Sequence, residues 1–410
     1  MILGVVNAGD TAFILVSAAL VALMTPGLAF FYGGLVRRKN FLSIMMQSFI
    51  SMGVVTAIWV IFGYSLAFGH DHGGIIGGLS WAGLDHVGQA PGPWAPTIPA
   101  LTHFIYQEMF AIITPALITG AFADRVRFSS YLWFLVLWSI IVYIPFVHWI
   151  WGGGWLAKHG VLDFAGGAVV HMSAGYAALA SVFVVGRRKF APGERMLPHN
   201  VAFVALGTGL LWFGWFGFNG GSALAANGVA AQAFVNTDIA GSIAMCTWLA
   251  VGWLHQGKPS LVGALTGAVA GLATVTPCAG YIPTWAAFIV GVLAGLVCYY
   301  AVQFVKKMNW DDALDVWAAH GVGGTLGIIL LGVFAYKSVD AAGANGLVAG
   351  NAHFFAWQVI TAVVIATYAF VATFLILKFL NLFGSVRVPD SEELRGLDET
   401  EFGEAAYNLQ

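Results

Sequence analysis

Two histidines lie inside long apolar segments of this sequence and are its strongest candidates for chemistry. His171 lies within 168–172, Ala-Val-Val-His-Met, and His320 within 318–322, Ala-Ala-His-Gly-Val. An imidazole can donate, accept or relay a proton near neutral pH, and an ionisable side chain inside a membrane is functional by default. We interpret the pair as facing a shared pore. The alternative is a neutral imidazole that hydrogen-bonds across a helix interface.

A metal site at these histidines is disfavoured, because no third Cys, Asp or Glu ligand can be placed at the same depth. We therefore expect no metal and no cofactor. Asp163, in the segment 162–167, Leu-Asp-Phe-Ala-Gly-Gly, precedes the apolar run that holds His171. Its carboxylate can cap a helix and favour the positive end of the helix dipole, or it can attract a cation. The two roles are compatible.

Aromatic residues supply a second group of candidates. Trp151 lies in the glycine-rich segment 149–155, Trp-Ile-Trp-Gly-Gly-Gly-Trp. A tryptophan at the membrane interface is the usual explanation, but the glycines suggest backbone folded into a vestibule, where an indole face could hold a small cation. Phe110 and Phe218 fit ordinary helix packing equally well, and Ser222 could make one hydrogen bond.

An acidic segment offers a competing enzymatic interpretation. Asp311, Asp312 and Asp315 match the Asp-rich pattern with which membrane prenyltransferases hold magnesium diphosphate. Such enzymes need a second, facing acidic cluster, and no cytoplasmic connection before the tail has one. We expect these aspartates to cap the following helix and to pair with Lys306 or Lys307. The predicted protein is therefore not an enzyme.

The elements that must position these residues are membrane helices. Of 410 residues, 59% are hydrophobic and only 9% are charged, so a water-facing surface of this size cannot be covered. A net charge of −2 excludes a nucleic-acid binder. Three cysteines cannot form a disulfide framework, and we expect each to be a buried thiol. Lipid is the solvent of this chain.

Eleven apolar runs are long enough to cross a bilayer as helices. A mid-span histidine in the fifth and the tenth, and Gly-Gly pairs closing the first and the sixth, suggest an inverted repeat of five helices, 10–186 and 199–335. The predicted transmembrane domain is 1–384, with a tail at 385–410. The predicted spans are 10–34, 42–68, 101–123, 128–147, 165–186, 199–218, 232–254, 260–276, 284–305, 315–335 and the long eleventh, 353–383.

Basic residues predict the orientation. Fifteen of the 17 lysines and arginines lie in the odd-numbered connections and the C-terminal part of the chain, which includes Lys378 near the end of the eleventh span, whereas the even-numbered connections hold only Lys158 and Lys337. Cytoplasmic loops carry the excess of positive charge, so we expect the N-terminus outside, the tail in the cytoplasm, and a multi-pass protein of the cell membrane. The first run lacks a basic n-region, which favours a span over a signal peptide.

Sequence blocks in the same order along nearly the whole chain resemble the ammonium transporter, methylammonium permease and Rhesus protein family, specifically its bacterial and archaeal ammonium transporter branch. The blocks that carry the resemblance are 31–34, 123–128, 148–154, 162–167, 215–222 and 275–277, followed in the tail by 387–389, 396–398 and 406–408.

The resemblance implies an all-helical, eleven-span homotrimer with one pore in each protomer, which carries ammonium or ammonia and also methylammonium. It implies roles residue by residue. Trp151 and Ser222 resemble the outer recruitment site, and Phe110 also lines it. Phe110 and Phe218 resemble the stacked gate, and His171 and His320 resemble the twin histidines. Asp163 resembles the essential carboxylate, and Gln107 resembles the polar pore residue.

The tail resembles the segment that contacts a trimeric PII-type signalling protein in the cytoplasm, although Phe402 stands where the family often has histidine. The tail residues carried over are Arg387, Gly396, Leu397, Asp398 and Tyr407. A second function therefore stays open, in which the protein senses ammonium and signals through a separate cytoplasmic protein.

Energetics favour deprotonation before passage. Moving a small ion from water into a medium of dielectric about 4 costs about 20 kcal/mol, which relaxation and water reduce to several. Removing a proton from an amine such as lysine, with a pKa of about 10.4, costs about 4.6 kcal/mol at pH 7. We expect ammonium to bind as a cation, lose its proton and cross as ammonia. The proton could follow through the histidine pair, which would make transport electrogenic.

Overall fold

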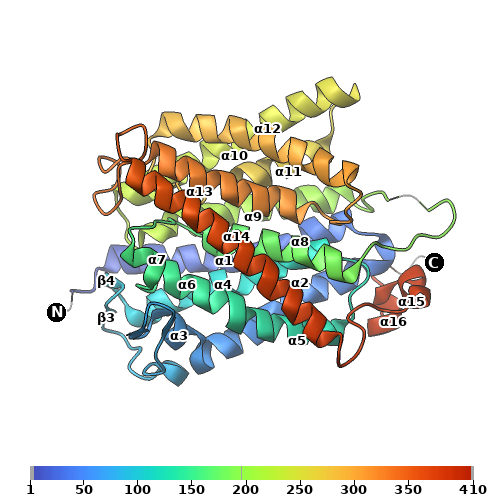
Figure 1. Cartoon of the computed structure of the whole chain (residues 1–410), viewed down its shortest axis with the longest axis horizontal. Helices are drawn as coiled ribbons and strands as arrows, with labels where there is room; N and C mark the ends of the chain where they lie inside the picture. Colours follow the sequence, from blue (N-terminus) through green and yellow to red (C-terminus); the bar gives the residue numbers. More distant parts are fainter. Residues whose placement is uncertain (1–3, 195, 408–410) are drawn as a thin grey trace.

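The computed structural model describes residues 4–194 and 196–407 as a bundle of long helices (Figure 1). The N-terminus lies at one end of the bundle and the C-terminal segment at the other. The α-helices are α1 Ala8–Leu35, α2 Phe41–Ile58, α3 Tyr64–Phe68, α4 Ala100–Ile118, α5 Phe128–Trp138, α6 Ile144–Ile150, α7 Trp155–Lys158, α8 Ser173–Val185, α9 Val201–Gly220, α10 Gly228–Gln256, α11 Leu261–Val275, α12 Thr284–Lys307, α13 Gly323–Phe334, α14 Ala352–Leu380, α15 Asp390–Arg395 and α16 Leu397–Phe402.

Shorter elements join or interrupt these helices. Two antiparallel hairpins, β1–β2 and β3–β4, lie at the N-terminal end of the bundle. The bounds are β1 Asp71–His72, β2 Ile76–Gly77, β3 Pro91–Gly92 and β4 Ala95–Pro99 for the strands; η1 Arg38–Asn40, η3 Ala82–Leu84, η4 Thr119–Ala121 and η7 Gly221–Ala223 for the 3₁₀ turns; and η2 Trp59–Gly63, η5 Ser139–Tyr143, η6 Gly167–Met172 and η8 Trp317–Val322 for the π-helical segments.

The predicted spans are confirmed as helices. Within the described residues, ten helical stretches are long and apolar enough to cross a membrane, and the shorter apolar helix α11 coincides with the predicted run 260–276. The fourth stretch, Phe128–Lys158, extends furthest beyond its predicted end at 147, because α6 and α7 continue it past the glycines near Trp151. The polypeptide is a polytopic, all-helical membrane protein.

Both candidate histidines lie in π-helical segments, which in α-helical proteins are frequent at functional sites. His171 lies in η6 and His320 in η8, and each segment runs directly into an α-helix, α8 or α13. A π turn contains one residue more than an α-helical turn, so one residue bulges out of the regular pattern of backbone hydrogen bonds. The two histidines are thus presented by matching local structures.

The two halves of the chain match further at fixed distances from these histidines. Asp163 precedes His171 by eight residues, and Asp312 precedes His320 by the same number. Each aspartate accepts backbone N–H groups at the start of its π segment. A glycine follows each histidine by four residues, Gly175 and Gly324. These correspondences support the inverted repeat that the sequence suggests.

The basic residues gather at the end of the bundle that carries the tail. There Arg37 donates to Asp124 and to the carbonyl of Lys189, and Arg188 binds Asp311. We call this the basic end and the opposite one the mouth end. Arg195, which belongs to the same predicted set, lies outside the described residues, as does Asn408 of the tail block.

The outer surface of the bundle is apolar, as lipid contact requires. Large exposed side chains include Phe213 on α9, Trp253 on α10 and Phe288 on α12. Cys278 and Cys298 are buried as predicted, but Cys246 is exposed on α10, so the prediction was wrong for this thiol. In a membrane helix an apolar neighbourhood in sequence does not distinguish the interior from the lipid face, because both are apolar.

Candidate functional site

A cavity of about 230 Å³ opens at the mouth end and brings several predicted residues together. We call it the mouth cavity. Its wall includes Trp151, Asp163, Ser222, Phe110 and Gln107, which come from four different connections and helices. Gln107 thus lies on the mouth side of the phenylalanine rings. The resemblance implied that Gln107 is a polar residue of the pore, whereas the small cavity beside the histidines has other lining residues.

Trp151 is held by a folded, glycine-rich backbone, as the sequence suggested. Its indole nitrogen donates to the carbonyl oxygen of Asp163 at 2.7 Å. A Cβ built on Gly152 would stand 2.0 Å from the carbonyl oxygen of Ala67, and Gly153 has φ +76°. Backbone atoms therefore approach too closely here for any side chain. The indole is fixed at the edge of the mouth cavity.

A polar cluster that sequence reasoning missed anchors this loop. The ring of His148 is buried, with Nδ1 2.9 Å from the carbonyl oxygen of Ala67 and Nε2 2.9 Å from Asp71 Oδ1. Lys158 Nζ lies 2.5 Å from the other carboxylate oxygen of Asp71. Hydrogen bonds from Lys158 and His148 hold the pKa of Asp71 well below its usual range. His148 lies three residues before Trp151 in the sequence. This short spacing could have indicated that the histidine helps to hold the tryptophan loop.

Ser222 presents a hydrogen-bond acceptor at the mouth. Its hydroxyl donates to the carbonyl oxygen of Phe218 at 2.9 Å, and Tyr106 Oη, which lies 3.2 Å from Ser222 Oγ, donates to the same carbonyl at 2.7 Å. With its single proton engaged, Ser222 Oγ keeps lone pairs for a donor. A small cation with N–H groups meets this requirement. Tyr106 is a second residue that the sequence analysis missed.

Two phenylalanine rings lie in contact below the mouth cavity. The rings of Phe110 and Phe218 have centroids 4.1 Å apart and an interplanar angle of 34°. Both side chains are buried, and Trp151 meets Phe110 edge-on at 5.9 Å. The structure therefore places Phe110 both at the wall of the mouth cavity and in the aromatic pair, as the resemblance implied.

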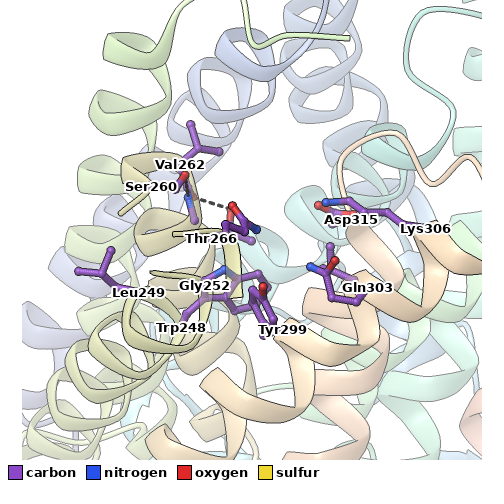
Figure 2. Close-up of a pocket in the computed structure, with 13 residues that line it drawn as sticks. Trp248, Leu249, Gly252, Ser260, Val262, Thr266, Tyr299, Gln303, Lys306 and Asp315 are labelled. Atoms are coloured by element: carbon purple, nitrogen blue, oxygen red, sulfur yellow. Dashed lines mark hydrogen bonds between the residues drawn. The ribbon is translucent and has the colours of Figure 1, made fainter. Parts of the chain in front are cut away.

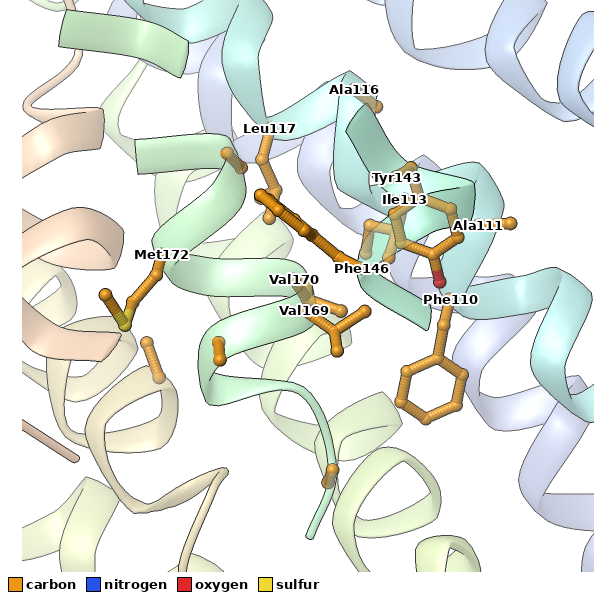
Figure 3. Packing of buried hydrophobic residues seen from close by; sticks show 14 of the residues in the cluster. Phe110, Ala111, Ile113, Ala116, Leu117, Tyr143, Phe146, Val169, Val170 and Met172 are labelled. Atoms are coloured by element: carbon orange, nitrogen blue, oxygen red, sulfur yellow. The ribbon is translucent and has the colours of Figure 1, made fainter. Parts of the chain in front are cut away.

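The space beyond these rings is narrow and apolar. A cavity of about 10 Å³, no more than the room of one water molecule, is lined by both histidines and otherwise mainly by apolar side chains. Figure 3 shows Val169 and Val170 of η6 facing α4, where Ile113 and Leu117 pack. An ion that kept its hydration shell would not fit in this space.

The two imidazoles are in direct contact. His171 Nδ1 and His320 Nδ1 are 3.2 Å apart, and their rings are nearly parallel, with centroids 5.2 Å apart. The ring of His171 also stacks on Trp215 and lies 6.0 Å from Phe218. The predicted pair therefore lies directly below the aromatic pair, in one continuous file of rings.

Hydrogen bonds around Thr276 assign the tautomers of this pair. The Thr276 hydroxyl donates its one proton to the carbonyl oxygen of Leu272 at 2.8 Å and accepts from Trp215 Nε1 at 2.9 Å. His171 Nε2, 3.3 Å from the same oxygen, must then be the donor. His171 Nδ1 is consequently an acceptor, and His320 donates to it from Nδ1. This leaves His320 Nε2 without a proton in the neutral pair.

Glycines allow the two π segments to cross closely enough for this contact. A Cβ on Gly175 would stand 2.1 Å from the backbone nitrogen of Gly321. A Cβ on Gly324 would stand 2.7 Å from the carbonyl oxygen of Gly167. Both obstacles are backbone atoms, which cannot turn aside as a side chain can. Close approach through small residues is the general packing device of membrane helices.

Asp163 has the geometry of a helix cap. Its Oδ1 accepts from the backbone nitrogens of Gly166 and Gly167, and its Oδ2 accepts from those of Ala168 and Val169, at 2.7 to 3.1 Å. Burial raises the pKa of Asp163, whereas these four bonds lower it. The carboxylate lies behind the wall of the mouth cavity, so it can stabilise a cation there through its field while it caps η6.

The three aspartates of the acidic segment at the basic end, Asp311, Asp312 and Asp315, have different contacts. Asp312 Oδ2 accepts from the backbone nitrogen of Trp317 and so caps η8, as predicted. Asp311 does not pair with Lys306 or Lys307. Arg188 donates to it from both Nε and Nη2, because the connection before α9 folds back over the segment. The pKa of Asp311 is about 2, since these bonds outweigh the effect of its burial. The three carboxylates do not converge on one metal position.

Asp315 lines a different cavity, of about 190 Å³, between α10, α11 and α12 (Figure 2). Figure 2 shows Lys306 beside Asp315, across the cavity from Ser260 and Thr266. Burial raises the pKa of Asp315 to about 6, against the charges of Lys306 and Arg188. The cavity opens at the basic end of the bundle, opposite the mouth cavity.

The tail docks onto the connections of the basic end. Asp398 accepts from the backbone nitrogens of Leu42 and Ser43, which start α2, at 3.0 and 2.8 Å. The backbone nitrogen of Leu397 donates to Asn40. A Cβ on Gly396, at φ +117°, would stand 2.6 Å from Lys39 Cβ. These tail residues face the bundle, and Figure 1 shows α15 and α16 beside its end.

The other tail residues carried over from the resemblance are engaged in the same way. Arg387 donates to Glu393 at 2.6 Å and forms a β-bridge with Val126. Tyr407 Oη lies 3.1 Å from His199 Nε2. Phe402, the departure from the family pattern, packs its ring against Phe128 at 5.1 Å. In this structure the predicted partner-binding residues hold the tail in place.

Comparisons with known proteins agree with one another. The model of the Ammonium Transporter Family matches residues 12–407. An ammonium transporter of Bacillus subtilis is 48% identical over 97% of this chain and 98% of its own length. The crystal structure of Mep2 from Candida albicans superimposes with a TM-score of 0.89 at 35% identity, covering 98% of this chain and 90% of the other. A structure named Sensor Amt Protein superimposes with a TM-score of 0.88 at 28% identity, covering 96% and 98%.

Proposed function

This chain belongs to the ammonium transporter family and transports ammonium across a membrane, and we propose that it does so by separating the proton from the substrate at the mouth end. Ammonium binds at Trp151 and Ser222, loses its proton, and crosses as ammonia past Phe110 and Phe218. The protein is a transporter and not an enzyme.

The observation that carries this proposal is the continuous file of rings from the mouth cavity to the histidines, with room for no more than about one water molecule. In such a space little water can enter to reduce the desolvation cost of an ion below its idealised value of about 20 kcal/mol, whereas deprotonation of an amine at pH 7 costs about 4.6 kcal/mol. The indole face of Trp151 and the lone pairs of Ser222 suit a cation. Apart from the thioether of Met24, the small cavity below Phe218 is lined by aromatic, aliphatic and imidazole groups.

The histidine pair supplies a route for the proton. His320 donates from Nδ1 to His171 Nδ1, and His320 Nε2 is free to accept, so one proton entering at Nε2 can be matched by another leaving the pair. Transport by this route carries net charge. Gln107 lines the mouth cavity, and we assign it to recruitment and not to the relay.

The decisive experiment is solid-supported membrane electrophysiology on reconstituted protein. Pulses of ammonium or methylammonium should give transient currents, and potassium should not. The double variant His171→Leu with His320→Leu should lose the ammonium current or pass larger cations. Ammonia uptake without charge movement would remove the proton-following step. An unchanged current and selectivity in the double variant would mean that the histidines are structural.

We further propose that the mouth end faces outward and the basic end faces the cytoplasm of a cell membrane, with 1–384 forming the transmembrane domain and 385–410 a regulatory tail. The distribution of basic residues supports this orientation. We also propose a homotrimer, in which part of the exposed apolar surface packs against neighbouring copies. Light scattering on the purified protein should give three chains per particle.

A second candidate function is ammonium sensing, which the structural likeness to the Sensor Amt Protein favours. The docked tail contacts the start of α2 and the loop before α9, so a shift of the bundle would reach the cytoplasmic surface. A separate cytoplasmic protein of the PII type would detect that shift by binding to the changed surface. Liposomes without partners distinguish the two functions, because a transporter shows ammonium flux there and a pure sensor does not.

A further inference from the structure

A groove of about 620 Å³ at the basic end is lined largely by cations and shares no lining residue with the mouth cavity or with the small cavity at the histidines. We call it the cationic groove. It lies where the end of α8, the end of α12 and the start of the tail meet, and its lining cations are Arg187, Arg188, Lys189, Lys306 and Arg387. One carboxylate, Asp311, also lines it.

The protein's own carboxylates account for three of these cations. Arg188 binds Asp311, Lys189 pairs with Asp390 at 3.2 Å, and Arg387 binds Glu393. Arg187 and Lys306 form no ion pair with any described residue, and both side chains are exposed. Arg187 therefore faces the groove with its charge uncompensated, whereas Lys306 also lines the cavity that holds Asp315, so its charge acts on both sides.

Neutral donors complete the lining. Asn309 and the indole of Trp310 also line the groove. A phosphate group needs several N–H donors and positive charge, and arginine and lysine side chains supply both. The groove therefore has the donor set of a phosphate site.

The surroundings of Trp310 indicate where the phosphate comes from. The indole packs edge-on against Phe183 at 5.2 Å and against Phe304 at 5.6 Å. Those two phenylalanines are 47% and 45% exposed, on the outer surface of membrane-spanning helices. Trp310 thus separates the cationic groove from the hydrocarbon-facing surface, which is the usual position of tryptophan at a membrane interface.

From these contacts we propose that the cationic groove binds the phosphate of an anionic phospholipid from the leaflet at the basic end. The phosphate lies between Arg187 and Lys306, and the acyl chains follow Phe183 and Phe304 into the bilayer. A soluble phosphate would use the same cations but would not explain the continuity with the lipid-facing rings.

This site adjoins the docked tail. Lys189 and Arg387 line the groove and also bind the tail residues Asp390 and Glu393. A lipid headgroup adds negative charge to a region with surplus positive charge, so it should hold the loop 187–190 and the start of the tail together. The inference needs only the membrane-spanning fold and holds for either orientation of the bundle.

Native mass spectrometry of the purified protein tests this proposal. The wild type should bind phosphatidylglycerol more tightly than phosphatidylcholine with the same acyl chains. Arg187→Gln with Lys306→Gln should weaken phosphatidylglycerol binding about tenfold, because two charge-assisted contacts are lost. The matched control, Lys258→Gln with Lys307→Gln, removes two positive charges from residues that do not line the groove and should bind as the wild type does.

Equal weakening in both double variants would mean diffuse attraction and would overturn the proposal, as would equal binding of the two lipids by the wild type. Millimolar inorganic phosphate, added to protein in a neutral detergent, should raise the thermal unfolding temperature much less than phosphatidylglycerol does. An equal rise, lost in the groove variant, would assign the groove to a soluble anion and overturn the lipid assignment. Equal unfolding temperatures of both variants in detergent alone verify that they are folded.

Discussion

At the scale of single residues, the hydrogen bonding of the histidine pair depends on Thr276, which lines neither the mouth cavity nor the small cavity beside the histidines. Thr276 has one hydroxyl group, and three hydrogen bonds meet there: one given to Leu272 and two received from Trp215 and His171. Because the hydroxyl proton is committed to a backbone carbonyl, the proton of His171 stays on Nε2. The direction of the hydrogen bond between the histidines follows from this one oxygen.

Replacing Thr276 by valine should therefore impair both stability and transport. Valine keeps the shape but leaves two buried N–H groups unpaired, which costs about 1–3 kcal/mol each. The thermal unfolding temperature should fall, and methylammonium uptake should drop. Thr276→Ser keeps the oxygen and should retain most of both. Uptake by the valine variant equal to that of wild type would show that the hydroxyl does not orient His171.

Asp312 predicts a pH dependence of stability. Burial and the nearby Asp315 raise the pKa of Asp312 from 3.8 to about 7. Between these two values the folded state binds more protons than the unfolded state, so the contribution of Asp312 to stability falls as pH rises from 4 to 7 and is constant above 7. The full penalty is at most about 4 kcal/mol.

Asp312→Asn keeps an oxygen for the N–H of Trp317 and removes the charge. The variant should unfold at a higher temperature than wild type at pH 7 and above, and the difference should shrink towards pH 4. Thermal unfolding of both proteins between pH 4 and 7 measures this difference in unfolding temperature. Parallel curves would show that Asp312 does not titrate in this window.

At the scale of elements, the important event is the crossing of two π-helical starts, η6 and η8. Hydrophobic patterning places each segment in a span, but the contact between them depends on Gly175 and Gly324, where an added Cβ would stand only 2.1 and 2.7 Å from backbone atoms of the other segment. A cap at the start of each segment, Asp163 or Asp312, fixes its direction. The two imidazoles meet because both elements are pinned at their starts and at their crossing.

Gly175→Ala should separate the two segments. The added methyl group would lie 2.1 Å from a backbone nitrogen, so the helices must shift, at a cost of about 1–3 kcal/mol or more. Transport current should be lost or strongly reduced, and the unfolding temperature should fall. The control is Gly209→Ala on α9, where a Cβ meets nothing within 4 Å. Full activity of both variants would contradict the assigned role of the crossing.

At the scale of the whole molecule, one file of rings leads from the mouth cavity to the histidine pair, and the tail closes over the connections of the basic end. Asp398 is buried and caps α2, whereas Asp390 makes an exposed pair with Lys189. The tail is thus attached by buried hydrogen bonds more than by surface charge pairs, which contribute about 0–1 kcal/mol each.

Asp398→Ala should release the tail. Loss of a helix cap costs about 0.5–2 kcal/mol, and the released segment should be cut by trypsin after Arg395 faster than in wild type. Asp390→Ala should change the cleavage rate little, since its pair with Lys189 is exposed. Equal protection of all three proteins would mean that other contacts hold the tail.

The sequence by itself determined the class of the molecule and the identity of its most costly residues. Spans follow from composition because lipid demands apolar helices, and His171, His320 and Asp163 stand out because ionisable groups in such runs are rare. The tertiary structure alone decided which groups meet. Thr276, Trp215, Tyr106 and His148 are ordinary in sequence, since a hydrogen bond formed across the bundle leaves no periodicity along the chain. It also decided that Asp311 pairs with Arg188, that Cys246 faces outward and that Gln107 lines the mouth cavity. The positions of Cys246 and Gln107 depend on the rotation of packed helices, which apolar runs do not specify, and the pair of Asp311 with Arg188 depends on how two connections fold over one another.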